Sequence, residues 1–143
     1  MTNNACRIGI ARSVFELLGV VFMRFRPIQR IWGAWLVAVN AAALLFIANI
    51  EAQVTLGAVG VALLAQALIY QRKRFIRVLG MTHVIWVPML AWIALRLDTL
   101  PEGETTFHLW LITLIATNAV SLVIDTWDAT RFVLGERQPY YSW

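Results

Sequence analysis

The chain has 143 residues, of which 60% are hydrophobic and 14% are charged, and its formal net charge is +4. Soluble domains carry roughly 25% charged residues, so this composition excludes an ordinary soluble fold and predicts a single-domain, all-α membrane protein. The basic residues flank apolar stretches instead of gathering on one face, which argues against nucleic acid as a partner.

Residues 1–30 form a basic segment ahead of the first long apolar stretch. Its apolar part, residues 12–23, is too short to cross a bilayer and predicts an interfacial helix, with the nearby arginines at anionic lipid headgroups. A soluble or poorly ordered extension is the alternative, and Met23 is itself a candidate initiator. A cleaved signal peptide fits the sequence less well, because the apolar stretch that follows has the full length of a span.

Four apolar stretches are long enough, at about 1.5 Å per residue, to cross a hydrocarbon core of about 30 Å. Backbone polar groups in lipid have to be satisfied within their own segment, so each stretch is predicted to be a helix. We expect a four-helix transmembrane bundle over residues 31–125, followed by a cytoplasmic helix extension and an aromatic tail over residues 126–143. The expected spans are residues 31–50, 54–70, 78–97 and 107–125.

The basic residues also predict the orientation of the bundle, because Lys and Arg in short flanks stay on the cytoplasmic side. Every Lys and Arg except Arg96 lies before the first span, between the second and third spans, or after the fourth. Acidic residues dominate the two remaining connections. We therefore expect both termini in the cytoplasm, with the bacterial inner membrane as the location.

Small residues predict where helices pack closely, because lipid offers no other strong drive for their association. Ala34, Ala38 and Ala42 recur every fourth residue on the first span, and Gly57 and Gly60 thin the second span. The sequence therefore predicts a tight pair between the first two helices.

Polar residues inside the spans are the main candidates for a functional site, because they are costly in lipid. Most of them share one face of the fourth span, and the first and second spans add one each. The candidates are Asn40, Gln66, Thr113, Thr117, Asn118, Ser121 and Asp125. One interpretation is interhelical hydrogen bonding that holds the bundle together, and the other is a hydrated polar path. Asp125 also lies where an arginine at the membrane boundary is able to pair with it.

An ionic cluster is expected in the two outer connections. Glu51, Arg96 and Asp98 supply opposite charges there. Exposed pairs of this kind stabilise a fold by only about 0–1 kcal/mol, so we expect the cluster to fix helix register.

The two histidines lie near opposite ends of their spans, so they are unable to share one metal or haem. Each is interpreted as a packing or interfacial residue, and no metal site is expected. The single cysteine, Cys6, offers neither an internal disulfide nor a cysteine-based metal site. Lipid or quinone binding beside His83, Trp86 and Trp92 is a weaker hypothesis, because it rests on residue type alone.

No nucleophile with a base, glycine-rich phosphate loop or paired metal-ligand motif occurs in the sequence, so we expect neither an enzyme nor a cofactor. The first functional hypothesis is assembly, as a homo-oligomer or as a subunit of a larger membrane complex. The alternative is a small transporter or channel whose polar path uses the intramembrane candidates.

Overall fold

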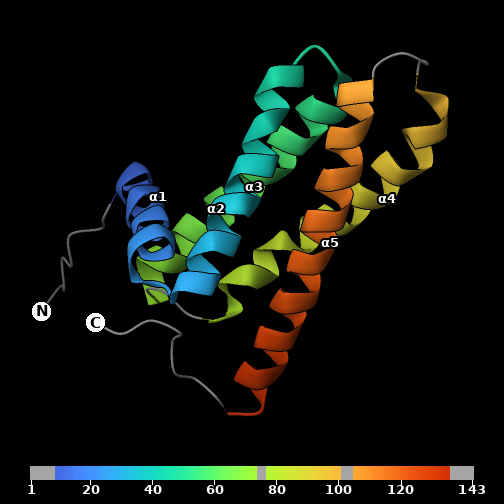
Figure 1. Cartoon of the computed structure of the whole chain (residues 1–143). Helices are drawn as coiled ribbons and strands as arrows, with labels where there is room; N and C mark the ends of the chain where they lie inside the picture. Colours follow the sequence, from blue (N-terminus) through green and yellow to red (C-terminus); the bar gives the residue numbers. More distant parts are fainter. Residues whose placement is uncertain (1–8, 74–76, 101–104, 136–143) are drawn as a thin grey trace, which may run out of the picture.

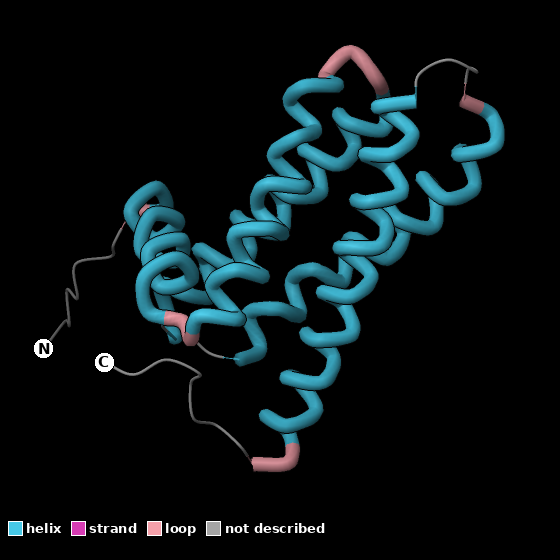
Figure 2. The backbone as a smooth tube through the Cα atoms, viewed as in Figure 1, coloured by secondary structure: helices cyan, strands magenta, loops and turns pink. Residues whose placement is uncertain are grey.

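The computed structural model describes residues 9–73, 77–100 and 105–135, and these residues form helices and no strand (Figure 1, Figure 2). Cys6 and the expected aromatic tail lie outside the described residues. In chain order, the elements are α1 (Ile10–Gly19), η1 (Val20–Arg24), α2 (Pro27–Ala41), η2 (Ala42–Phe46), α3 (Ile50–Lys73), η3 (Arg77–Ile85), α4 (Trp86–Arg96), η4 (Leu97–Thr99) and α5 (Thr105–Val133). Here η1 is a π-helical turn, and the other η elements are 3₁₀ segments.

Four helical segments are long and apolar enough to cross a membrane, which confirms the predicted all-α fold with four candidate spans. They are Pro27–Phe46, Ile50–Arg72, Leu79–Thr99 and Thr105–Val133. The first span is shifted from its predicted range, because it begins before residue 31 and ends before residue 50.

Local chemistry explains the bounds of the first span. Pro27 occupies the first turn of α2, where its missing N–H is not needed and its fixed φ suits a helix. At the other end, the Asn49 amide donates to the Phe46 carbonyl at 2.8 Å, and the Gln53 side chain donates to the Ile47 carbonyl at 3.0 Å. These bonds close the turn that joins α2 and η2 to α3.

The four spans form a closed ring of neighbours. The first contacts the second, the second the third, the third the fourth, and the fourth the first. In Figure 1 the connection between η2 and α3 lies at the top of the bundle, and α1 lies toward the opposite end, beside α2 and α3. We call these the Glu51 end and the Tyr70 end, after the residues that α3 places there.

The Glu51 end is held by aromatic packing and by an ion pair between Arg96 and Glu51. The rings of Phe46, Phe107 and Trp110 lie 5.0 to 5.7 Å apart, and the Trp110 indole donates to the Val39 carbonyl at 3.0 Å. Because these residues come from η2, α5 and α2, the cluster ties the first span to the fourth.

The Tyr70 end carries α1, which packs against α3. Leu17 from α1, Tyr70 from α3 and Leu79 from η3 form one buried apolar cluster. The Tyr70 hydroxyl donates to the Glu16 carboxylate at 3.0 Å. The N-terminal segment is therefore folded onto the bundle at the end where the third span begins.

The small residues predicted to pack the first two spans together lie mostly outside the interior, although α3 buries other small residues, among them Ala52, Ala58 and Ala62. Ala34 and Ala38 are exposed on α2, Ala42 is half-buried, and Gly57 and Gly60 are exposed on α3. The first span instead sends Val39, Asn40 and Ala43 into the interior. The predicted close pairing of α2 and α3 through Ala34 and Ala38 is thus not what the structure shows.

The third span changes its winding partway along. Its first part, η3, is a long 3₁₀ segment, although 3₁₀ runs of more than about 3–4 residues are uncommon. Pro88 lies in the first turn of α4, where the helix does not need its missing N–H. The η3 segment packs on α5 at Gly80, where a Cβ atom would lie 2.1 Å from Asp125 Oδ1.

We expect Gly80→Ala to destabilise the fold by about 1–3 kcal/mol, because the added methyl group would push η3 away from Asp125. The measurement is equilibrium unfolding in mixed micelles. Gly60→Ala is the matched control, since a Cβ at Gly60 meets nothing within 4 Å and alanine favours a helix by about 0.5–1 kcal/mol over glycine. Equal stability changes in the two variants would contradict the close approach at Gly80.

Candidate functional site

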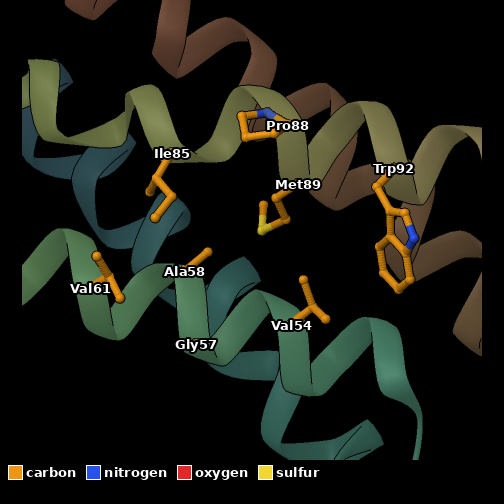
Figure 3. Close-up of a pocket in the computed structure, with 8 residues that line it drawn as sticks. All are labelled: Val54, Gly57, Ala58, Val61, Ile85, Pro88, Met89 and Trp92. Atoms are coloured by element: carbon orange, nitrogen blue, oxygen red, sulfur yellow. The ribbon is translucent and has the colours of Figure 1, made fainter.

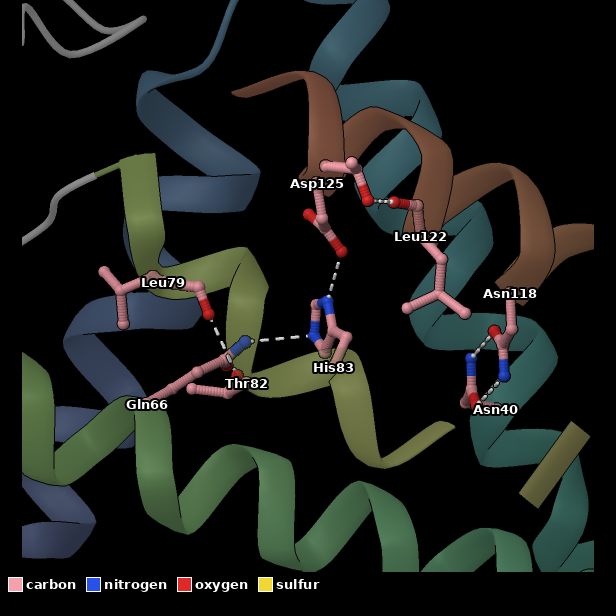
Figure 4. Close-up of polar contacts among 9 residues, drawn as sticks. Asn40, Gln66, Leu79, Thr82, His83, Asn118, Leu122 and Asp125 are labelled. Carbon is pink, nitrogen blue, oxygen red and sulfur yellow. Dashed lines mark hydrogen bonds and ion pairs between the residues drawn. The ribbon is translucent and has the colours of Figure 1, made fainter. Parts of the chain in front are cut away.

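The intramembrane polar side chains form two separate groups inside the bundle (Figure 4). We call Gln66, His83 and Asp125 the His83 cluster, and Asn40 and Asn118 the asparagine pair. The His83 cluster joins α3, η3 and α5, whereas the asparagine pair joins α2 and α5. Each group therefore crosslinks helices that are far apart in the sequence.

His83 lies between two polar partners. Its Nδ1 is 2.7 Å from Asp125 Oδ2, and its Nε2 is 3.0 Å from the amide nitrogen of Gln66. A neutral imidazole has one donor and one acceptor nitrogen. Because the Gln66 amide nitrogen is a donor, Nε2 accepts and Nδ1 carries the proton that faces the carboxylate. With the Gln66 amide in this orientation, the contacts fit the neutral tautomer that is protonated at Nδ1.

The cluster is largely removed from solvent. The side chains of His83 and Asp125 are 15% and 17% exposed. Two ionisable groups are thus in direct contact inside a segment that is apolar enough to cross a membrane. Such pairs are expensive in lipid and mark ion or proton sites in many membrane proteins.

The 3₁₀ winding of η3 explains how His83 reaches Asp125. In this helix, residues three apart lie directly above one another, so Gly80, His83 and Trp86 line up at the start of α4. Gly80 leaves room for the Asp125 carboxylate, and the His83 ring stacks on Trp86 with centroids 4.0 Å apart. The imidazole is therefore fixed by stacking as well as by hydrogen bonds.

Trp86 closes the apolar side of the cluster. The residue is 3% exposed, and its indole nitrogen has no hydrogen-bond partner within the described part of the chain. An unmade hydrogen bond in a buried site costs about 1–3 kcal/mol. The His83 imidazole thus stacks on the indole of Trp86 with one face, while its two nitrogens contact Asp125 and Gln66.

The asparagine pair is a reciprocal hydrogen bond between α2 and α5. The Asn40 amide donates to Asn118 Oδ1 at 2.9 Å, and the Asn118 amide donates to Asn40 Oδ1 at 3.1 Å. Both residues are buried, and Asn118 is fully inaccessible. This geometry matches the interhelical hydrogen bonding expected from the sequence, in which each bond contributes about 0.6–2 kcal/mol.

The remaining candidates on α5 have different surroundings. Thr117 is buried and accepts a hydrogen bond from the Trp35 indole at 3.1 Å, and Ser121 is buried between the two polar groups along α5. Thr113 donates to the Leu109 carbonyl of its own helix. Asn40 and Gln66, both candidates for one polar path, belong to different groups.

Of the three residues expected in the outer ionic cluster, Glu51 and Arg96 form an ion pair. Arg96 Nε lies 2.7 Å from Glu51 Oε1, and the guanidinium lies 5.0 Å from the centre of the Trp92 ring. The Glu51 side chain is 3% exposed, so this is a buried carboxylate and not the exposed group expected from the sequence. Asp98 is exposed on η4. Removing Arg96 would leave a buried charge without its partner.

The proposed lipid or quinone residues lie in two places. Trp92 lines an apolar groove of about 370 Å³ between α3 and α4, together with Gly57 and Pro88 (Figure 3). His83 and Trp86 are stacked on each other and do not line this groove. The structure therefore does not bring the three residues into one site.

Sequence reasoning missed the pairing of His83 with Asp125, although a signal was present. The two residues lie near the same end of adjacent spans, and both are ionisable. The partner suggested for Asp125 from the sequence was instead an arginine at the membrane boundary. It also missed the bond between Glu16 and Tyr70. Within the described residues, no group of three or more His, Cys, Asp or Glu side chains is placed to hold a metal ion.

Comparisons with protein-family models, with curated proteins and with solved structures found no match to this chain. The function therefore has to be argued from the geometry of the polar groups.

We expect the asparagine pair to be energetically coupled. Asn40→Leu and Asn118→Leu should each destabilise the fold, and the double variant should recover about 1 kcal/mol relative to their sum, because neither amide is then left unpaired. The measurement is a double-mutant cycle by equilibrium unfolding. Thr113→Val is the control, since its hydroxyl bonds within its own helix. Strict additivity of the two substitutions would contradict the pairing.

Proposed function

We propose that this chain is a small proton-conducting membrane transporter whose proton-binding site is the His83 cluster. The observation that carries the proposal is the direct contact between the His83 imidazole and the Asp125 carboxylate inside a candidate span. Ionisable side chains within transmembrane segments commonly serve as proton relays. Histidine is suited to this role because its charge changes near physiological pH.

The hydrogen bonds around His83 support one position for a second proton. In the tautomer that these contacts fit, Nδ1 carries a proton toward Asp125, so we propose that the second proton binds at Nε2, which faces Gln66. When Nε2 is protonated it becomes a donor, and Gln66 has to turn its amide to present Oε1. Of the groups placed against the ring, Asp125 from α5 is the ionisable one, whereas Gln66 from α3 and Trp86 from α4 are neutral. Asp125 then balances the charge of the imidazolium.

A route from this site toward the centre of the bundle is offered by the polar face of α5. Ser121 and Asn118 precede Asp125 on this face, and Asn118 lies about 10 Å from it along the helix axis. Because the asparagine pair is closed, passage beyond it requires the two amides to separate. A four-helix protomer encloses little volume, so we propose that the conducting unit is an oligomer.

The proposal includes an orientation of the bundle in the membrane. We place the Tyr70 end in the cytoplasm of a bacterial cell and the Glu51 end on the outer side of its inner membrane. The positive residues at the Tyr70 end support this placement. The His83 cluster then lies in the half of the membrane that is nearer the cytoplasm, and both termini are cytoplasmic.

We expect liposomes that contain the purified chain to lose an imposed pH gradient faster than protein-free liposomes. Asp125→Asn and His83→Gln should return the rate to the protein-free level, because neither replacement side chain exchanges a proton near neutral pH. The measurement is the fluorescence of a pH dye trapped inside the liposomes, with valinomycin and potassium to balance charge.

His108→Gln is the matched control, because it removes the other histidine, near the Glu51 end, and should leave the rate unchanged. A wild-type rate equal to that of protein-free liposomes would contradict the proposal, as would unchanged flux in Asp125→Asn. Native mass spectrometry of the same preparation measures the oligomeric state.

We expect Asp98→Cys, in a Cys6→Ser background, to react with an impermeant maleimide added outside intact cells. Asp98 is exposed at the Glu51 end. Thr130→Cys, which replaces an exposed residue beyond the Tyr70 end of the bundle, should react only after the cells are opened. The reverse pattern of labelling would show that the proposed orientation is wrong.

The second candidate function is that of a subunit in a larger membrane complex. It is favoured by the exposed small residues Ala34 and Ala38 on α2 and Gly57 and Gly60 on α3, which allow another helix to approach closely. Liposomes without proton flux, together with a membrane protein that co-purifies in fixed stoichiometry, would support this function over transport.

A further inference from the structure

The N-terminal arm, which we define as α1, η1 and the connection to α2 through Arg26, has two apolar sides and one charged edge. Ser13, Leu17 and Val20 are buried against the bundle. Phe15 lies on the side of α1 that faces away from this contact, and Phe22 is a second exposed aromatic side chain, on η1. Phe15 is 75% exposed and Phe22 is 37% exposed. The arm therefore presents large apolar side chains outward although its inner side is already packed.

Basic side chains accompany this outward apolar side. Arg12, Arg24, Arg26 and Arg30 are exposed. The one acidic residue between Gly9 and Arg30 is Glu16, and its carboxylate accepts bonds from Arg12 and Tyr70, both at 3.0 Å. The surface of the arm is therefore strongly positive beside exposed aromatic rings.

Hydrogen bonds and close packing within the protein fix the direction of the chain at the end of the arm. Arg30 donates to the carbonyl groups of Met23 and Phe25, at 3.0 and 3.2 Å. A Cβ atom at Gly33 would lie 2.6 Å from Val21, so η1 sits close against α2. Because these contacts hold the arm in place, its exposed side is presented in a constant orientation.

We propose that the exposed side of the N-terminal arm binds the anionic headgroups of the bilayer surface, with Phe15 and Phe22 entering the upper part of the acyl region. Amphipathic helices with aromatic and arginine side chains lie in the interface in this way. Charge complementarity selects anionic phospholipid as the partner, because neutral headgroups offer the arginines no net attraction. The proposal does not depend on proton flux through the His83 cluster.

The arm also contacts the segment that carries the site. Leu17 packs with Leu79, and Leu79 is next to Gly80 at the Asp125 contact. The carbonyl of Leu79 accepts a bond from the Thr82 hydroxyl at 2.9 Å. The arm that we propose to bind lipid therefore also packs against the start of η3.

The first test uses native mass spectrometry of the full chain in detergent with equal amounts of phosphatidylglycerol and phosphatidylcholine. We expect phosphatidylglycerol to be retained preferentially. Arg26→Gln should weaken its retention by about fivefold, the usual effect of one basic residue near an anionic surface. Arg131→Gln, which removes the same charge outside the arm, should change retention by less than half as much.

The second test places a spin label at Phe15→Cys in a Cys6→Ser background and reconstitutes the chain in nanodiscs of phosphatidylcholine and phosphatidylglycerol. We expect the label to collide with oxygen more than with a water-soluble nickel reagent. A water-accessible label, or equal retention of the two lipids, would overturn the proposal. The proposal would also be overturned if the protein bound poly-glutamate but retained phosphatidylglycerol no better than phosphatidylcholine. That result would indicate an acidic protein, and not the bilayer, as the partner of the arm.

Discussion

A polar side chain inside a hydrocarbon layer has to find its hydrogen-bond partner within the protein, and, apart from the Trp86 indole, the polar side chains that join the spans of this bundle follow that constraint. Asn40 bonds to Asn118, the Trp35 indole to Thr117, and the His83 ring to both Asp125 and Gln66. Each of these bonds joins two different spans. The polar groups therefore specify which helices are neighbours, while apolar contacts fill the space between them.

The fourth span is the common partner in most of these bonds. The first span reaches it through Trp35 and Asn40, and the third reaches it through His83. At the Glu51 end, Trp110 of the same helix bonds to the first span as well. Because α5 is a continuous helix, it aligns the asparagine pair and the His83 cluster along one edge. That alignment is what makes a proton route along α5 physically reasonable.

The fold was predictable to the extent that it follows from hydropathy. Long apolar stretches fixed the four candidate spans, because helices are the main way for a single chain to cross lipid. Hydropathy did not locate the turn after Phe46, since Ile47 and Ala48 are as apolar as the helix before them. That turn depends on the Gln53 side chain, whose bond to the Ile47 carbonyl has no signature in composition.

The candidate site was predictable only in part. Helical spacing placed Asn118, Ser121 and Asp125 on one face of α5, and these residues do face the interior. Spacing was unable to assign partners, because the winding of η3 decides where His83 points. A periodicity argument assumes an α-helix, in which Gly80, His83 and Trp86 would not line up. Similarly, spacing found the small residues of α2 without showing that Ala34 and Ala38 face outward.

The 3₁₀ winding of η3 determines both the length of the third span and the direction in which the His83 imidazole points. Three residues complete a turn in a 3₁₀ helix but fall short by about 60° in an α-helix. Rewinding this segment into an α-helix would therefore swing His83 around the axis relative to Gly80. It would also shorten the segment, because the rise per residue drops from about 2.0 to about 1.5 Å. A change of pitch in this part of the chain is thus inseparable from a break in the contact with the carboxylate of α5.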